Sequence, residues 1–165
     1  MIQDKLMKVM FAVILVSILG CDSSGENNPP SNDSVRNFYT QNKVHIESFV
    51  EFCALQERVR WLGVNDIDLS SKSDANLDDF SVANTRLVMT DLGIESMFCA
   101  RDYSKINAPL VSVTLPLYNS GLSVSGVSKG IKFIVVESAR VKEQINNGEL
   151  THLGDTGWYI YYRES

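Results

Sequence analysis

The spacing of hydrophobic residues changes partway along this 165-residue chain, and that change most limits the folds it can adopt. Residues 35–62 contain no proline or glycine. One side of this segment carries apolar residues at the helical spacing i, i+3, i+4 and i+7, namely Ile46, Phe49, Val50 and Cys53. Between residues 110 and 117 apolar and polar residues alternate instead, as they do in strands. The sequence therefore predicts a long first helix over 35–62, with a sheet after it.

Turn and cap residues place the next helix. Residues 58–64, RVRWLGV, could instead leave the first helix and run extended. The position of the C-terminal end of that helix is therefore left open between these two alternatives. A second helix is predicted to start at Asn76, with Asp79 three residues on and Gly93 as a left-handed C-cap. Its expected core residues are Leu77, Phe80, Leu87, Val88 and Leu92.

The remaining segments predict strands and one short helix. Strands are expected at 67–69, 96–100, 110–117, 131–136 and 158–162. A third helix over 139–145 follows the cap residue Ser138, and Gly148 closes it. This order indicates an α+β domain, in which a long N-terminal helix and two further helices pack on a small, mainly antiparallel sheet.

The N-terminal segment has the anatomy of an export signal. Lys5 and Lys8 precede an apolar run over 9–19, which at about 1.5 Å per residue is too short for a bilayer core of roughly 30 Å. A basic start, a short apolar run and a small residue before a cut indicate a secretory signal peptide. The alternative is an uncleaved anchor or a buried apolar helix.

The sequence at the expected cut is more specific. Ile18-Leu19-Gly20-Cys21 resembles the lipobox of bacterial lipoproteins, in which the cysteine is lipidated and becomes the first residue. The resemblance implies that residues 1–20 are a lipoprotein signal peptide and that lipid on Cys21 anchors the protein to the membrane of the cell envelope, facing the periplasm. Asp22 resembles the signal that retains enteric lipoproteins in the inner membrane.

Composition defines the segment after Cys21 and the boundaries of the folded part. Residues 21–34 include DSSGENNPPSNDS, which has no apolar side chain able to pack, so they are predicted to form a disordered tether. Residues 35–165 are then enough for a single domain with one core.

The net charge excludes one class of partner. Lys and Arg number 15 against 20 Asp and Glu, a net charge of −5. Because nucleic-acid binding is dominated by phosphate neutralisation, an acidic domain without a basic cluster in its sequence is not expected to bind nucleic acid. For the same reason the anchoring to the membrane is expected to come from the lipid.

Two cysteines remain if Cys21 is lipidated. An even pair in an exported protein favours a disulfide between Cys53 and Cys99, and the alternative is two separate buried thiols. If residues 96–100 form a strand, Met97 and Cys99 share one face and should point at the long helix, with Phe98 on the other side.

Residues 126–130, GVSKG, match the G-x-S-x-G pattern of serine hydrolases. That pattern requires a strand before the serine and a helix after it, yet the following IKFIVV predicts a strand. The favoured interpretation is a serine-rich hairpin loop whose glycines supply positive φ. Its residues Ser123, Ser125, Ser128 and Lys129 form a candidate binding surface. The alternative is a serine hydrolase that uses Ser128 with His152.

The chain ends in its densest aromatic stretch, GWYIYYRES. In a strand, Trp158, Ile160 and Tyr162 share one face and Tyr159 and Tyr161 the other. Core packing is the favoured role, and an aromatic platform for a sugar or peptide is the alternative.

The serine- and glycine-rich loop together with this W-Y-x-Y-Y end resembles small uncharacterised bacterial proteins, and some such lipoproteins are immunity factors that neutralise toxins in the periplasm. We therefore expect a non-catalytic binding, immunity or accessory module with a protein partner. Neither His45 nor His152 has a second ligand at metal spacing, so no metal and no cofactor are expected.

Overall fold

The computed structural model describes residues 28–71, 76–122 and 125–164. The predicted signal peptide, the lipidation site Cys21, the first half of the predicted tether and Ser123 lie outside the described residues. Residues 32–34, which were also predicted to belong to the disordered tether, are helical instead. Within the described ranges, every helix is too short or too polar to cross a membrane.

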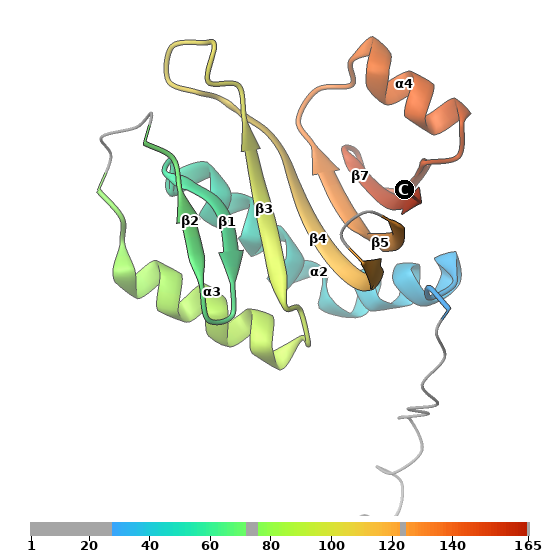
Figure 1. Ribbon diagram of the computed structural model, residues 1–165, viewed down its shortest axis with the longest axis horizontal. Helices are drawn as coiled ribbons and strands as arrows, with labels where there is room; N and C mark the ends of the chain where they lie inside the picture. The colour runs from blue at the N-terminus through green and yellow to red at the C-terminus, as the bar shows by residue number, and fades with distance from the viewer. Residues whose placement is uncertain (1–27, 72–75, 123–124, 165) are drawn as a thin grey trace, which may run out of the picture.

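A seven-stranded antiparallel sheet forms the centre of the described part of the chain (Figure 1). Its strands are β1 (Val59–Gly63), β2 (Ile67–Leu69), β3 (Ser96–Arg101), β4 (Leu110–Leu122), β5 (Ser125–Ile134), β6 (Leu150–His152) and β7 (Trp158–Glu164). They lie in the order β2-β1-β3-β4-β5-β7-β6, and each neighbouring pair is antiparallel. The helices are α2 (Asn32–Leu55), α3 (Asp79–Asp91) and α4 (Ala139–Asn146). The predicted α+β fold is confirmed.

The two faces of the sheet are covered differently. Helices α2 and α3 share one hydrophobic core with inward residues of β1, β3, β4, β5 and β7. Helix α4 contributes Val141 to a separate cluster with Tyr159, whose side chain points to the other face, as strand alternation requires next to Trp158 and Ile160. Helix α4 therefore covers only the β6–β7 end of that face, and none of the described helices lies on the face over β3, β4 and β5 (Figure 1).

Helix α2 supplies the central apolar stripe, as its spacing predicts. Its buried residues are Val35, Tyr39, Ile46, Phe49, Phe52 and Cys53. Ser31 caps the helix by accepting a hydrogen bond from the Ser34 amide, so the helix begins at Asn32, before the predicted Val35. A kink at Asn42 lets the side-chain amide donate to the carbonyl of Phe38 over 2.9 Å.

The prediction that this helix continues to Leu62 is wrong, and the extended alternative is right. The helix ends at Leu55, and Val59–Gly63 forms β1, paired with β2 and β3. As strand residues, Val59 and Leu62 are each 0% exposed. Sheet pairing and burial of these two side chains outweigh the helical alternative for this segment.

The predicted disulfide is present at the end of α2. Cys53 and Cys99 are bonded, with 5.5 Å between their Cα atoms. Met97 and Cys99 are buried towards the helix, whereas Phe98 is 44% exposed on the opposite face, so the predicted alternation in β3 is also confirmed.

Two polar side chains fix the same helix end. The Arg101 guanidinium donates to the carbonyls of Cys53 and Ala54 at the helix terminus, and also to the carbonyl of Ala108 over 3.0 Å. A cation there satisfies carbonyl groups that have no partner within the helix. The buried Gln56 accepts a hydrogen bond from the Asp78 amide over 3.0 Å, which connects this end to the start of α3.

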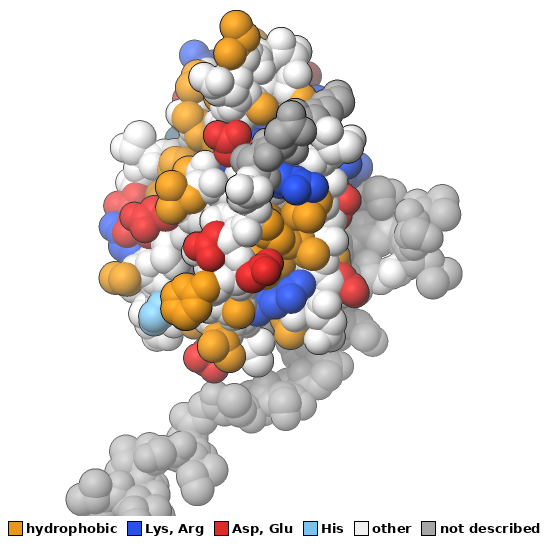
Figure 2. Space-filling model, turned by 90° about the vertical axis from the view of Figure 1, so that its left-hand side faces the viewer, with side chains coloured by type: hydrophobic (Ala, Val, Ile, Leu, Met, Phe, Trp, Pro, Cys, Tyr) orange, Lys and Arg blue, Asp and Glu red, His pale blue; other side chains and the backbone are white. Residues whose placement is uncertain are grey.

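The second helix is present, but its start and part of its core face differ from the prediction. Its N-cap is Asp78 rather than Asn76, and Val82, Thr85 and Met89 are its buried residues. Phe80 and Leu87, which were expected in the core, are 80% and 64% exposed. Leu77, Val88 and Leu92, which were also expected in the core, do pack against it as partly buried residues. Hydrophobic side chains are exposed among acidic and basic ones on the side of the molecule where β2 and α3 lie (Figure 2).

The GVSKG segment lies inside strand β5 rather than in a loop, which corrects the predicted hairpin loop. Ser128 pairs with Asn119 of β4 and with Arg163 of β7. Gly121 has a φ of 101°, but Gly126 and Gly130 are not among the glycines with positive φ. A Cβ at Gly130 would lie 2.1 Å from the Leu115 carbonyl oxygen, so this glycine permits close approach at the β-bulge next to Pro116.

The disulfide predicts a stability change. It closes a loop of 46 residues, which corresponds to roughly 4 kcal/mol in the chain-entropy model. Replacing both Cys53 and Cys99 by Ala should lower the free energy of unfolding by about 2–5 kcal/mol, measured by denaturant titration. The matched control is wild-type protein in reductant, which should show a similar loss. Equal stability of oxidised and Cys-free protein would contradict this account.

Candidate functional site

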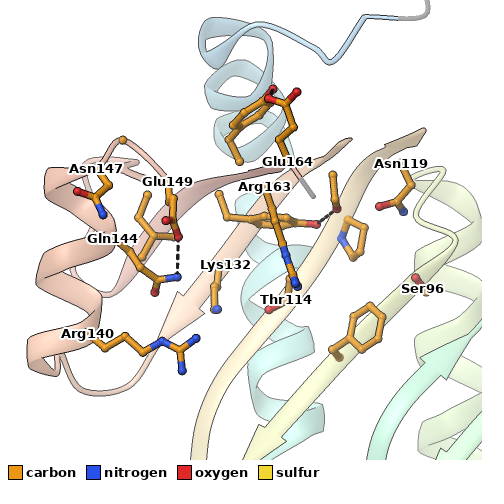
Figure 3. A pocket seen from close by; sticks show the side chains of 17 residues that line it. Ser96, Thr114, Asn119, Lys132, Arg140, Gln144, Asn147, Glu149, Arg163 and Glu164 are labelled. Carbon is orange, nitrogen blue, oxygen red and sulfur yellow. Dashed lines mark hydrogen bonds between the residues drawn. The ribbon is translucent and has the colours of Figure 1, made fainter. Parts of the chain in front are cut away.

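The candidate site is a groove of about 850 Å³ on the sheet face that α2 does not cover (Figure 3). Its floor carries Phe98 of β3, Thr114 and Pro116 of β4 and Lys132 of β5. These side chains share a face because Phe98 pairs with Thr114 and Thr114 pairs with Lys132. Residues of α4 and the C-terminal half of β7 form the walls.

Helix α4 is held firmly as one wall. The Ser138 side chain accepts from the Val141 amide and caps the helix as predicted, and Gly148, with a φ of 77°, ends it. Beneath the helix, the Tyr159 hydroxyl donates to the Glu137 carboxylate. Burial, and then this carboxylate, raise the pKa of Tyr159 to about 12. The tyrosine therefore stays a neutral donor across the physiological range and connects β7 to the segment before α4.

Three cations come from three different elements to the groove. Figure 3 shows Lys132 of β5, Arg140 of α4 and Arg163 of β7 with their charged ends directed towards a shared space. None of the three forms an ion pair with another described residue. Burial lowers the pKa of Lys132, and the charges of Arg140 and Arg163 lower it further. Lys132 is thus close enough to each of the two arginines to be repelled by its charge.

The Glu149 carboxylate lies beside these cations and accepts a hydrogen bond from the Gln144 amide over 3.0 Å. Glu164 also borders the groove, but alternation along β7 turns its carboxylate to the other face, where it accepts from the Tyr162 hydroxyl over 3.2 Å. The side chains directed into the groove therefore carry more positive than negative charge, although the whole chain is acidic. A positively charged groove focuses the electrostatic field and raises the local concentration of anions there, even in an acidic protein.

Ser128 lines this groove, but its surroundings differ from those of a hydrolase nucleophile. Its Oγ lies 3.0 Å from the Tyr161 hydroxyl. Burial raises the pKa of Tyr161, which disfavours the ionised form that could act as a base. His152 pairs with Tyr159, whereas Ser128 pairs with Arg163, four residues farther along β7 and thus about 13 Å away along the strand. The structure does not bring Ser128 and His152 together.

The predicted binding surface is only partly present as one surface. Ser128 and Lys129 are neighbours in a strand, so their side chains point to opposite faces. Lys129 is 8% exposed on the α2 side, and burial lowers its pKa. Ser125 is the first residue of β5, and Ser123 lies outside the described residues. Of the predicted residues that the structure describes, Ser128 is the one that lines the groove.

The charged residues that line the groove were missed by the sequence reasoning. Lys132 stands within the apolar run IKFIVV, where strand alternation places it opposite Ile131 and Phe133. A lysine at such a position is a detectable signal, because a buried central strand seldom carries one. Arg140 and Arg163 gave no such signal, since their proximity to Lys132 depends on how α4 and β7 pack.

The aromatic C-terminal strand mainly packs in the core, as favoured. Trp158 lies 5.2 Å from the ring centre of Tyr39 and 5.0 Å from that of Phe133. Ile160 is buried on the same side, and Tyr159 is 0% exposed on the other. Tyr161 is the member of this strand's aromatic set that faces the groove beside Ser128.

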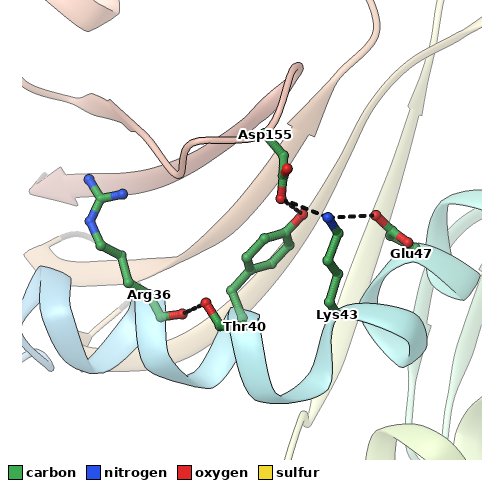
Figure 4. A network of polar contacts seen from close by, with 6 residues as sticks. Arg36, Thr40, Lys43, Glu47 and Asp155 are labelled. Carbon is green, nitrogen blue, oxygen red and sulfur yellow. Dashed lines mark hydrogen bonds and ion pairs between the residues drawn. The ribbon is translucent and has the colours of Figure 1, made fainter.

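A second polar cluster joins α2 to the turn between β6 and β7 (Figure 4). The Asp155 carboxylate accepts from the Tyr39 hydroxyl and from the Lys43 ammonium, each over 3.0 Å, and Lys43 lies 3.9 Å from Glu47. Hydrogen bonds from Lys43 and then from Tyr39 hold the pKa of Asp155 below its ordinary value. Every group in the cluster has a partner, so its role is to hold the turn against the helix.

No protein-family model, curated protein or solved structure matches the chain. In the part of the chain that the structure describes, no three His, Cys, Asp or Glu side chains are grouped as metal ligands would be.

The Asp155 cluster predicts a pH dependence. Because the pKa of Asp155 is lowered in the folded state, its stabilisation is complete above about pH 5 and is lost as pH falls through the lowered pKa. Asp155→Asn should lower the unfolding midpoint near neutral pH, and the difference from wild type should disappear at strongly acid pH. The control Asp68→Asn removes an exposed partner of Arg60 and should differ little from wild type. A difference for Asp155→Asn that stays constant with pH would contradict this role.

Proposed function

We propose that this chain is a lipid-anchored cell-envelope protein whose α+β domain binds a protein partner in an immunity or accessory role, and that the groove on the open sheet face is its binding surface. The observation that carries the proposal is the meeting of Lys132, Arg140 and Arg163 in that groove without an ion-pair partner among the described residues. Unpaired cations on a well-supported surface are a feature of recognition sites rather than of a packed core.

Two further observations support the location in the envelope. The lipobox-like Ile18-Leu19-Gly20-Cys21 provides a lipid attachment site at the end of an export signal. The Cys53–Cys99 disulfide is of the kind that persists in oxidising compartments such as the periplasm. Asp22 favours residence in the inner membrane. Anchoring would hold the domain at the membrane surface, where the effective concentration of a membrane-associated partner is high.

The alternative function is a serine hydrolase that uses Ser128. It is the weaker proposal because Ser128 lies within a strand, its hydroxyl contacts a tyrosine whose pKa is raised by burial, and His152 is about 13 Å away along β7. A hydrolase of the G-x-S-x-G type needs a general base in hydrogen-bond reach of the serine.

Lipid anchoring and partner binding are tested together in envelope preparations. Full-length wild type should incorporate a fatty-acid analogue, sediment with membranes and form cross-links to a protein partner. Cys21→Ala should lose the fatty-acid label and leave the membrane fraction, because Cys21 carries the acyl chains. The matched control, with Cys53 and Cys99 both replaced by Ala, should keep the label.

Persistent fatty-acid labelling of Cys21→Ala would contradict the anchoring. The absence of any cross-linked protein from the wild-type sample would contradict the binding role.

A further inference from the structure

The groove concentrates positive charge that the rest of the described structure does not neutralise. Lys132, Arg140 and Arg163 face one another, and the carboxylate beside them is that of Glu149, which accepts a hydrogen bond from Gln144. The side chains directed into the groove therefore carry more positive than negative charge. In a chain of net charge −5, such a local excess is a specific feature of this surface.

Holding the three cations together has an electrostatic cost. The burial of Lys132, and then the charges of Arg140 and Arg163, disfavour the charged form of that lysine and lower its pKa. An anion placed between them would remove the repulsion and would gain charge-assisted hydrogen bonds from the two guanidinium groups. Guanidinium groups donate in a planar fork that matches a carboxylate or a phosphate.

The carboxylate of Glu149 favours a ligand carboxylate over a ligand phosphate. A phosphate monoester carries a charge of about −1.5 to −2 at neutral pH, so Glu149 would repel it more strongly than it would repel the single charge of a carboxylate. The same residue would discourage ligands with several closely spaced negative charges.

The floor of the groove adds an apolar requirement. Phe98 is 44% exposed there, and it lies on the same face as Thr114 and Pro116. An exposed phenyl ring beside a proline offers contact area to an apolar side chain but no hydrogen bond. A ligand that fills both parts of the groove therefore carries an apolar group close to its carboxylate. The volume of about 850 Å³ is sufficient for several residues of an extended polypeptide.

Together these features identify the chemistry of the ligand. Resting on the proposed function and extending it, we propose that the groove binds a polypeptide segment of the partner that brings one carboxylate to Lys132, Arg140 and Arg163 and an apolar side chain to Phe98 and Pro116. The segment lies across the open faces of β3, β4 and β5, with α4 beside it. Binding is by side chains, because the backbone groups of these strands are already paired within the sheet.

The direct test uses full-length protein in detergent and an array of short synthetic peptides, each with one glutamate beside one phenylalanine. A matched array carries glutamine in place of glutamate. Wild type should bind the glutamate array about tenfold or more tightly, and added salt should weaken this binding. Equal binding to both arrays would overturn the proposal. Inorganic phosphate that binds the groove while no peptide does would also overturn it, in favour of a phosphate site.

Variants locate the binding on the molecule. Replacing Lys132, Arg140 and Arg163 by Gln together should abolish the preference for the glutamate array, whereas Lys142→Gln should leave it unchanged, because Lys142 is exposed on α4 but does not line the groove. Thermal unfolding confirms that each variant is folded. If the triple variant does not fold, the single change Arg140→Gln at an exposed position of α4 gives the same test, with a loss of about tenfold.

Cross-linking in envelope preparations separates this proposal from the function on which it rests. A partner that is captured equally by wild type and the triple variant would overturn the groove proposal and leave the binding function intact. Peptide binding in the groove without any captured partner would support the groove chemistry and contradict the binding function. Capture by wild type and Lys142→Gln but not by the triple variant is the result that we expect.

Discussion

The fold depends on how helix α2 is fixed across one face of the sheet. Apolar burial supplies most of the stability, since each large buried side chain contributes roughly 1.5–3 kcal/mol and the α2 stripe and its partners form one continuous core. Burial is non-directional, however, and does not by itself choose a register. The Cys53–Cys99 bond and the Arg101 hydrogen bonds fix one end of the helix, and the Tyr39–Asp155 hydrogen bond fixes it farther towards the N-terminus.

This arrangement explains why the described helices leave part of the opposite face uncovered. With α2 and α3 on one side, the remaining helix, α4, is anchored by Val141 over Tyr159 and covers only the β6–β7 end. The floor made by β3, β4 and β5 is then open, and it carries polar and charged residues where the buried face carries aliphatic ones. Alternation along β5 illustrates the difference between the two sheet faces. Ile131 is 0% exposed in the core, while its neighbour Lys132 lines the groove.

The sequence predicts the parts of this structure that depend on local spacing. The stripe on α2, the alternation of Met97, Phe98 and Cys99, and the Ser138 cap were all predictable, because a few neighbouring residues decide them. The Cys53–Cys99 bond was predictable as well, because these two cysteines form an even pair apart from Cys21. Other features that depend on distant packing were not predictable. The end of α2 is decided by the pairing of β1 with β3, and helical spacing alone did not predict the exposed position of Phe80. The groove brings together three elements that are separate in sequence, and spacing reveals only the lysine of β5.

The central claim is that the open sheet face, rather than the α2 side, contacts the partner. Site-specific photo-cross-linking in envelope preparations tests it directly, with a photoreactive amino acid in place of Thr114 on the groove floor or in place of Val44, which is 78% exposed on α2. The account predicts partner adducts from position 114 and none from position 44. Adducts from position 44 with none from position 114 would contradict it, because the partner would then bind the helical side.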